Sequence, residues 1–147
     1  MKLKPDTLRL IQNGHRFSPF YSDGLSNHHP MAVAALDWLG ASDEEITAFA
    51  EHYEKILEPL PPPLGDITER TAADFLGRRP AVASWISFFR ALIASAGRET
   101  TTRLWLHTLM PGVGSVAFHG LLRLAYAVEI GDDTELAYAL EVAENNG

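Results

Sequence analysis

Apolar residues recur every three or four positions along most of this 147-residue chain, and glycine or proline punctuates the segments that they form. Ile46, Phe49 and Tyr53, for example, share one side of a segment whose other side carries glutamates. This spacing matches the turn of an α-helix, whereas the strict alternation of a half-buried strand is not visible. The pattern therefore predicts an all-α fold, a helical array or bundle of six to eight helices in a single domain over residues 1–147.

Local signals mark where several of these helices begin and end. Ser42 and Glu45 stand three positions apart and form a capping box, in which each satisfies a backbone N–H at the helix start. Glycines suited to C-terminal caps follow three segments, at Gly40, Gly97 and Gly131. Residues 99–109 are ambiguous because Thr100–Thr102 favours a strand. Since no partner strand is visible, we expect a helix there, and we expect the longest apolar helix over Ser115–Ile130.

Prolines locate one helix start and one break in the chain. Asn27 suits an N-cap because its side chain accepts a backbone N–H of the first turn, where Pro30 then falls. An aromatic loop is expected before it, over residues 14–25. The proline-rich run at 59–63 stops any helix and predicts a stiff connector, the one candidate boundary in the chain. Neither side of this connector looks large enough to stand alone.

Composition and charge exclude several classes of function. The formal net charge is −7, and nucleic-acid binding usually needs a clustered basic face, so nucleic acid is not an expected partner. The chain has no cysteine, which excludes disulfides, zinc–thiolate sites and iron–sulfur clusters. No stretch approaches the about 18 apolar residues of a membrane span, and Pro5, Asp6 and Arg9 interrupt any signal peptide. We therefore expect a cytoplasmic protein without a membrane partner.

Histidines are the first candidates for chemistry. The six histidines do not fall in an HExxH or ExxH spacing, which leaves a zinc-protease site and a ferritin-like di-iron site without support. His28 and His29 stand at the start of an apolar helix. Either they hydrogen-bond backbone groups at the helix end, or one of them is a metal ligand or a general base in a pocket. The residues alone leave both interpretations open.

The predicted helix over Ser115–Ile130 carries a polar stripe on an otherwise apolar surface. His119, Arg123 and Tyr126 are spaced i, i+4 and i+7 and therefore stack on one face. An unpaired buried charge is costly, so this stripe must meet partners or water. It is either an ion pair of Arg123 beside a histidine at the core edge, or the polar wall of a pocket.

One glycine pattern is similar to a cofactor motif. Gly112, Gly114 and Ala117 fit the GxGxxA fingerprint of dinucleotide-binding folds, and Asp132 stands where a ribose-binding acid is expected. The motif needs a parallel strand before it and a second strand–helix–strand unit after it, and neither is visible. We therefore interpret Gly112–Ala117 as a tight turn between helices. The alternative, NADPH binding at this turn, would require a strand at 101–109.

Two stretches of the chain resemble a known family. The first joins Asn27–Met31 (N-H-H-P-M) to Ala35–Ala41 (A-L-D-W-L-G-A) and is similar to an N-H-x-P-M…A-L-x-x-L-G-A opening. The second, Met110–Ala127, is similar to a P-G-x-x-x-x-A-F-H-G-L-I-R-x-A-Y-A block. Both occur in the expected order and at the expected spacing. Over nearly its whole length the chain resembles the questin oxidase-like family.

The resemblance implies a helical fold and an oxidoreductase activity. Fungal relatives oxidatively open the ring of anthraquinones; some look NADPH-dependent and some hold a non-haem iron through several histidines, while bacterial relatives mostly lack an assigned substrate. His28 matches the family histidine, His29 falls at a variable position, and His119 matches the histidine of the second block. Fungal members often have a histidine where Arg123 stands, so this chain departs from a multi-histidine iron site at that position. The second half of the family also has no counterpart in these 147 residues.

Two hypotheses follow for function. In the first, an oxygenase-like domain acts on a quinone or phenol, with His28 and His119 within about 8 Å of each other around Fe(II) or Zn(II). Arg123 and Tyr126 then orient the substrate or stabilise a phenolate, and NADPH is a co-substrate. In the second, a non-catalytic helical module binds a hydrophobic small molecule or forms a homodimer through an apolar surface near residues 115–147.

Overall fold

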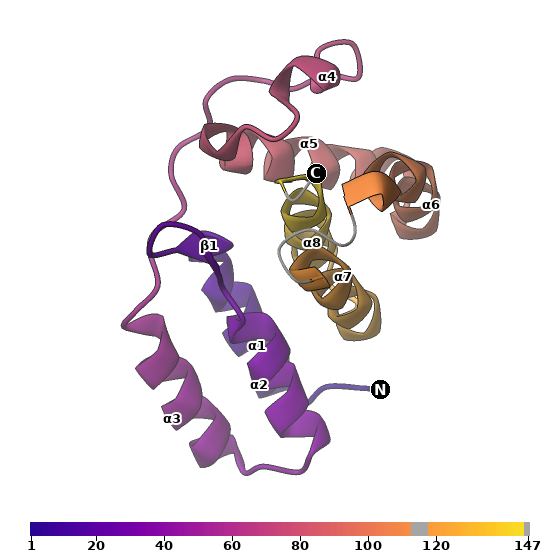
Figure 1. Cartoon of the computed structure of the whole chain (residues 1–147). Coiled ribbons are helices and arrows are strands. Elements are labelled where there is room, and N and C mark those ends of the chain that lie inside the picture. The colour runs from indigo at the N-terminus through magenta and orange to yellow at the C-terminus, as the bar shows by residue number, and fades with distance from the viewer. Residues whose placement is uncertain (113–117, 146–147) are drawn as a thin grey trace. The chain divides into compact units, whose positions relative to one another are not determined.

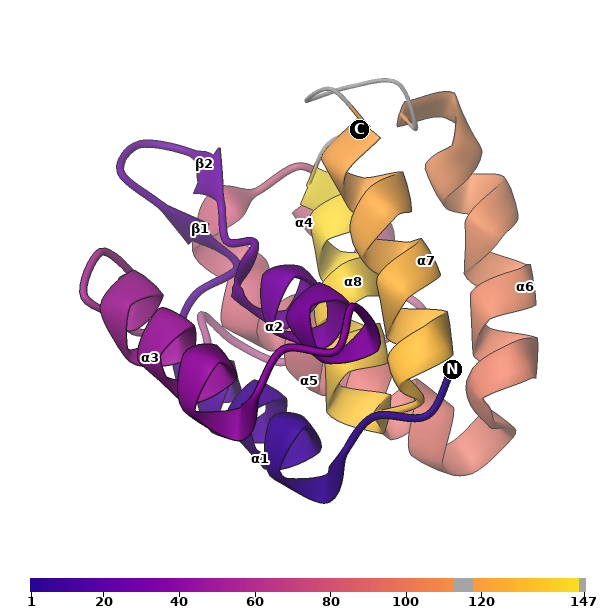
Figure 2. The same cartoon turned by 90° about the horizontal axis from the view of Figure 1, so that it is seen from below.

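The computed structural model describes residues 1–112 and 118–145. Within these residues the chain forms eight α-helices, three short 3-10 helices and one small hairpin, which confirms the all-α prediction (Figures 1 and 2). The chain divides into two compact units, Met1–Leu60 and Pro61–Gly147. The division falls inside the predicted proline-rich connector, and the single-domain assignment stays a prediction. No helix of the described residues is long and apolar enough to cross a membrane.

The first unit is a three-helix assembly. Helices α1 (Pro5–Asn13), α2 (His29–Trp38) and α3 (Asp43–Glu54) all contact one another. Their shared core consists of small and branched apolar side chains: Ile11, Met31, Val33, Ala34, Ile46 and Ala50. The predicted capping box is confirmed, because the Glu45 backbone N–H donates to Ser42 Oγ and the Ser42 N–H donates to Glu45 Oε2.

The segment before α2 is more ordered than the predicted loop. It contains strands β1 (Phe20–Tyr21) and β2 (Leu25–Ser26), which pair in antiparallel fashion. The turn between them places Ser22 and Asp23 at positive φ, a conformation that short polar residues tolerate better than most. Helix α2 begins at His29, so its N-cap is His28 and the prediction of Asn27 was one residue early. Asn27 Oδ1 nevertheless accepts the His29 N–H at 2.9 Å.

The second unit is built around its last helix. Helix α8 (Asp133–Asn145) contacts α5 (Val82–Ala96), α6 (Arg98–Leu109) and α7 (His119–Ile130), as Figures 1 and 2 show, and short α4 (Ala72–Phe75) precedes α5 in the chain. Rings from α5 and α6 stack edge to face, with Phe89 and Trp105 centroids 5.0 Å apart. The helix expected at 99–109 is therefore confirmed, because packing of these aromatic side chains outweighs the strand preference of the threonines.

Helix α7 is shorter than the predicted Ser115–Ile130. It starts at His119, because Phe118 adopts the left-handed conformation (φ 64°) that a helix cannot continue through. Residues 113–117 lie outside the described residues. At the start of α7 the backbone approaches α8 closely: a Cβ on Gly120 would stand 2.7 Å from Ala143 Cα. Glycine at this position therefore permits the packing of α7 on α8.

Candidate functional site

The predicted polar stripe exists on α7. His119, Arg123 and Tyr126 all lie within this helix, so the i, i+4, i+7 spacing brings them to one face. His119 and Tyr126 are partly exposed, whereas Arg123 is buried. Beside the stripe, α7 leaves large apolar side chains in solvent: Phe118, Leu121, Leu122 and Val128. Helix α7 thus presents a partly exposed histidine and tyrosine next to an apolar surface.

Arg123 lies in a buried ion pair between α7 and α8. Its Nε donates to Glu135 Oε1 at 2.9 Å and its Nη2 donates to Glu135 Oε2 at 3.2 Å, while both side chains are almost completely buried. The guanidinium carbon also lies 5.3 Å from the ring centroid of Tyr138. Of the two interpretations of Arg123, the ion pair is the observed one.

Burial dominates the ionisation of Tyr138. It raises the pKa of the Tyr138 hydroxyl to about 12, and the positive charge of Arg123 offsets only part of this effect. The negative charges of Glu135 and Glu141 raise the pKa further. Tyr138 therefore stays neutral at physiological pH, and the cluster between α7 and α8 serves to hold the two helices together rather than to exchange protons.

The two neighbouring histidines of α2 differ in their surroundings. His28 is half-buried, and its backbone N–H donates to the Tyr53 hydroxyl at 3.1 Å. His29 is only 1% exposed, and its Nε2 lies 3.3 Å from Glu54 Oε1 on α3. A Cβ on Gly14 would stand 2.9 Å from the His29 ring, so glycine is required beneath it. His29 is thus the packed residue of the two, and His28 keeps more access to solvent.

His28 belongs to the first unit and His119 to the second. Their proposed proximity around one ion therefore stays a prediction. Over residues 1–112 and 118–145, no group of three or more histidine and carboxylate side chains is placed to hold a metal ion. The described residues do not by themselves supply a ligand set, and we derive no chemical step through a metal.

The dinucleotide interpretation loses its structural basis. Residues Arg98–Leu109 form α6, where the fingerprint would need a parallel strand, and a 3-10 turn at Met110–Gly112 follows. The remaining motif positions, 113–117, lie outside the described residues. Any use of NADPH by this chain would have to rest on other groups.

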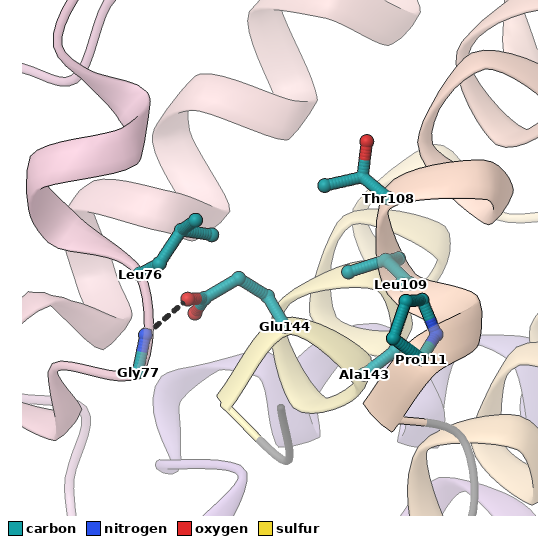
Figure 3. A pocket seen from close by; sticks show the side chains of 7 residues that line it. All are labelled: Leu76, Gly77, Thr108, Leu109, Pro111, Ala143 and Glu144. Atoms are coloured by element: carbon teal, nitrogen blue, oxygen red, sulfur yellow. Dashed lines mark hydrogen bonds between the residues drawn. The ribbon is translucent and has the colours of Figure 1, made fainter.

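A pocket of about 360 Å³ opens in the second unit where three segments meet (Figure 3). Leu76 and Gly77 come from the turn after α4, Thr108 and Leu109 from the end of α6, and Glu144 from the last turn of α8. The Glu144 side chain is only 3% exposed, and its Oε1 accepts the Gly77 N–H at 2.6 Å. Its Oε2 is buried and has no hydrogen-bond partner among the described residues.

This environment changes the acidity of Glu144. Burial raises the pKa of its carboxyl to about 7, and the hydrogen bond from the Gly77 N–H counteracts only part of that rise. A carboxyl with a pKa near neutrality can both donate and accept a proton. Sequence reasoning missed this residue, although a signal was present: α8 is largely apolar but carries three glutamates six and three residues apart, Glu135, Glu141 and Glu144, each of them buried.

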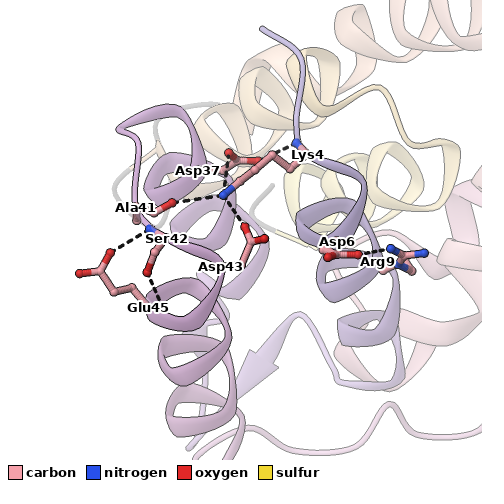
Figure 4. Close-up of polar contacts among 8 residues, drawn as sticks. All are labelled: Lys4, Asp6, Arg9, Asp37, Ala41, Ser42, Asp43 and Glu45. Carbon is pink, nitrogen blue, oxygen red and sulfur yellow. Dashed lines mark hydrogen bonds and ion pairs between the residues drawn. The ribbon is translucent and has the colours of Figure 1, made fainter.

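Two other electrostatic features are structural. In the first unit, Lys4 Nζ lies 2.6 Å from Asp43 Oδ1 and donates to the Ala41 carbonyl, which ties the start of α1 to the α2–α3 loop (Figure 4). The hydrogen bond to Asp43 raises the pKa of Lys4. The Ser42 N–H lowers the pKa of Glu45 by favouring the carboxylate. Both sites are exposed helix-end contacts, and Asp43 also lines a pocket of about 270 Å³ between α1 and α3.

The second unit also has an apolar groove of about 420 Å³ along α6 and α7. Leu106, Val128 and Leu136 contribute its apolar surface, and Arg98 and Arg103 stand at its edge. Each arginine is already paired, Arg98 with Asp133 and Arg103 with Glu99. This groove suits an uncharged apolar ligand better than an anion, since the arginine charges are compensated.

Comparison with known proteins agrees with the stretches noted in the sequence. No curated protein matches the chain in a sequence search. The family model described as questin oxidase-like matches residues 25–144, which include both α2 with His28 and α7 with His119. The match covers most of the 147 residues. The chain therefore belongs to the questin oxidase-like family.

Proposed function

We propose that this chain is an oxidoreductase domain that acts on an aromatic small molecule, a quinone or a phenol. Family membership supports an oxidase-like role. The observation that carries the proposal is the face of α7, where partly exposed His119 and Tyr126 flank a fixed arginine beside exposed apolar side chains. Apolar surface with a few polar groups suits a flat aromatic substrate.

Each residue of the stripe has a distinct role in this proposal. His119 exchanges a proton with the substrate or ligates a metal, and Tyr126 hydrogen-bonds a substrate oxygen. Arg123 acts as a positioning residue, because Glu135 occupies its guanidinium and so fixes α7 against α8. His28 joins them as the second histidine of the family pattern. A non-haem iron or zinc and the co-substrate NADPH remain proposals that the residues do not require.

Elemental analysis of the untagged protein tests the metal. We would compare wild type with His28→Ala/His119→Ala and with His52→Ala/His107→Ala, a matched control that removes one exposed histidine from each unit. About one iron or zinc per chain, lost only in the first variant, supports a shared site. Equal metal content in both variants, or none in wild type, removes the metal from the proposal.

Oxygen consumption tests the activity itself. A panel of hydroxyquinones and phenols is offered with and without NADPH. The expected result is turnover that His119→Ala lowers about 10²-fold or more, the range typical of losing a general acid–base group. The exposed-histidine control should keep wild-type turnover. Activity that survives His119→Ala unchanged contradicts the role of the α7 face.

The α6–α7 groove favours a second candidate function, a non-catalytic helical module that binds a hydrophobic small molecule. An apolar groove together with the exposed apolar side chains of α7 would also suit a homodimer. Sedimentation at increasing concentration distinguishes these cases from catalysis. A dimer that Leu122→Lys dissociates, in a protein without turnover, would favour this second candidate.

A further inference from the structure

The pocket beside Gly77 contains the carboxyl group of Glu144, which has no role in the function proposed for the α7 face. Glu144 is buried among apolar side chains, and one of its oxygens already accepts a backbone N–H. The other oxygen is buried, and it has no hydrogen-bond partner within residues 1–112 and 118–145. Because a buried polar atom of this kind costs free energy unless a ligand or water satisfies it, the free position points to a bound molecule.

The surroundings select a neutral ligand. Leu76, Leu109 and Ala143 form apolar walls, and Thr108 contributes the one additional side-chain hydroxyl among the described lining residues. No charged side chain is among the causes of the raised pKa of Glu144. Apart from Glu144 and Thr108, this lining offers few side-chain polar groups, so a ligand that is mostly apolar and carries one hydroxyl fits it best.

Neighbouring charged groups do not alter this conclusion. Arg78 follows Gly77 but lies against the Phe75 ring, 6.0 Å from its centroid, and His107 beside Thr108 is exposed. On α8 itself Glu141, one turn earlier, is buried and contributes to the pKa of Tyr138. The proton equilibrium at Glu144 is therefore governed by burial and by the Gly77 N–H.

Acidity then decides which hydroxyl compound fits. A phenol has a pKa near that of tyrosine, about 10, and Glu144 has a pKa of about 7. The equilibrium for proton transfer from the phenol to the Glu144 carboxylate is therefore unfavourable by roughly a thousandfold. For an aliphatic alcohol, with a pKa near that of water (about 15.7), the same equilibrium is unfavourable by roughly 10⁸-fold or more. A pocket of about 360 Å³ lies near the lower end of small-molecule sites, which fits one aromatic ring.

We propose that Glu144 binds the hydroxyl of a single-ring phenol in this pocket and takes its proton, leaving a phenolate and a neutral carboxyl. The bond that breaks is the phenol O–H, the bond that forms is the O–H on Glu144, and no electrons leave either partner. The choice of a phenol rests on the proposed function, while the position of its hydroxyl rests on Glu144 alone. In the reverse direction the neutral carboxyl donates its proton to a phenolate or hydrogen-bonds a quinone carbonyl.

Equilibrium binding of 4-methylphenol tests the site. For wild type we expect the Kd to tighten roughly tenfold from about pH 5.5 to about pH 8.5, because a carboxylate accepts a stronger hydrogen bond than a neutral carboxyl. Glu144→Gln should bind with a Kd that does not change with pH. Glu69→Gln, which removes an exposed carboxylate of the same unit outside the pocket, should behave as wild type.

Two further measurements keep the proposal testable if Glu144→Gln folds poorly. Thr108 is exposed at the pocket edge, so Thr108→Trp should fill the pocket and abolish binding while the circular dichroism spectrum is retained. The probe 4-nitrophenol, whose ionised form is yellow, reports the proton. At about pH 7 part of the wild-type-bound probe should be yellow. Less of the probe bound to Glu144→Gln should be yellow, because the amide accepts no proton and an apolar pocket disfavours release of the proton to water.

The outcomes separate this inference from the proposed function. An unchanged pH dependence in Glu144→Gln, or no binding of either phenol to wild type, overturns the assignment of Glu144. If the Glu144→Gln and wild-type proteins consume oxygen equally with phenols, the proposed function stands and the Glu144 site is wrong. Glu144-dependent binding without any turnover supports the site and removes the oxidoreductase function.

Discussion

Replacing Arg123 by methionine should destabilise the second unit severely. Methionine keeps much of the aliphatic volume of arginine but leaves the Glu135 carboxylate, which is 0% exposed, without its guanidinium. Breaking a buried ion pair by removing one partner costs about 3–5 kcal/mol, because the remaining charge is buried and uncompensated. This is a large fraction of the about 5–15 kcal/mol that stabilises a typical domain.

The double variant shows whether the cost comes from the stranded charge. Arg123→Met/Glu135→Leu removes both charges and should recover most of the lost free energy, since an apolar pair of similar volume is often neutral in stability. An exposed pair serves as the matched control. The side chains of Arg98 and Asp133 are 52% and 58% exposed, so Arg98→Met should cost less than about 1 kcal/mol.

Urea unfolding followed by circular dichroism measures these differences by linear extrapolation. A loss below about 1 kcal/mol in Arg123→Met would refute the reasoning, since the charge of Glu135 would then be solvated or compensated elsewhere. A double variant less stable than Arg123→Met would also contradict it, because the ion pair rather than the stranded carboxylate would then supply the stability.

Two further predictions concern α8 and its neighbours. Folding raises the pKa of Glu144 from 4.5 to about 7, so the folded state binds more protons than the unfolded state between these pH values. The free energy of unfolding should therefore fall by about 2 kcal/mol as pH rises through this window, allowing for partial solvent screening. Glu144→Gln should lose this pH dependence in urea titrations, and an equal slope in both proteins would contradict the raised pKa. Gly120→Ala should lower the melting temperature despite its better helix propensity, because its Cβ would stand 2.7 Å from Ala143 Cα and cost about 1–3 kcal/mol; an unchanged or higher melting temperature would show that α7 and α8 separate freely.

Local rules of helix formation carried much of the fold prediction. The Ser42–Glu45 capping box depends on four consecutive residues, so sequence alone could identify it. Helix α6 was predicted correctly over its three threonines because no partner strand was available to pair with them. The tiny hairpin at 20–26 was missed, since strands of two residues leave no alternation to detect.

The start of α7 could not be predicted from periodicity. Apolar residues continue upstream of His119 at helical spacing, but the backbone of Phe118 adopts the left-handed conformation. Phenylalanine has no preference for that conformation, so the sequence could not predict it. Tertiary packing is visible at this end of α7, where Gly120 lies close against Ala143 of α8. The same packing is long-range in sequence and therefore invisible to a window of neighbouring residues.

Helical spacing in the sequence was enough to identify the candidate residues of α7, but it could not identify the buried glutamates of α8. The face shared by His119, Arg123 and Tyr126 follows from the helical repeat. The partner of Arg123 did not, because a glutamate is usually expected at the surface and Glu135 is buried. Glu144 was overlooked for the same reason, although three acids on so apolar a helix are themselves a reason to expect buried charge.

The contact between Gly14 and the His29 ring has a consequence for how relatives can diverge. With histidine at position 29, even one methyl group at position 14 would stand 2.9 Å from the ring. A lineage that replaced His29 by a smaller side chain would release position 14 to accept alanine or serine, and the reverse order of substitutions would be blocked. The two positions should therefore covary, and His29 becomes hard to regain once position 14 has changed.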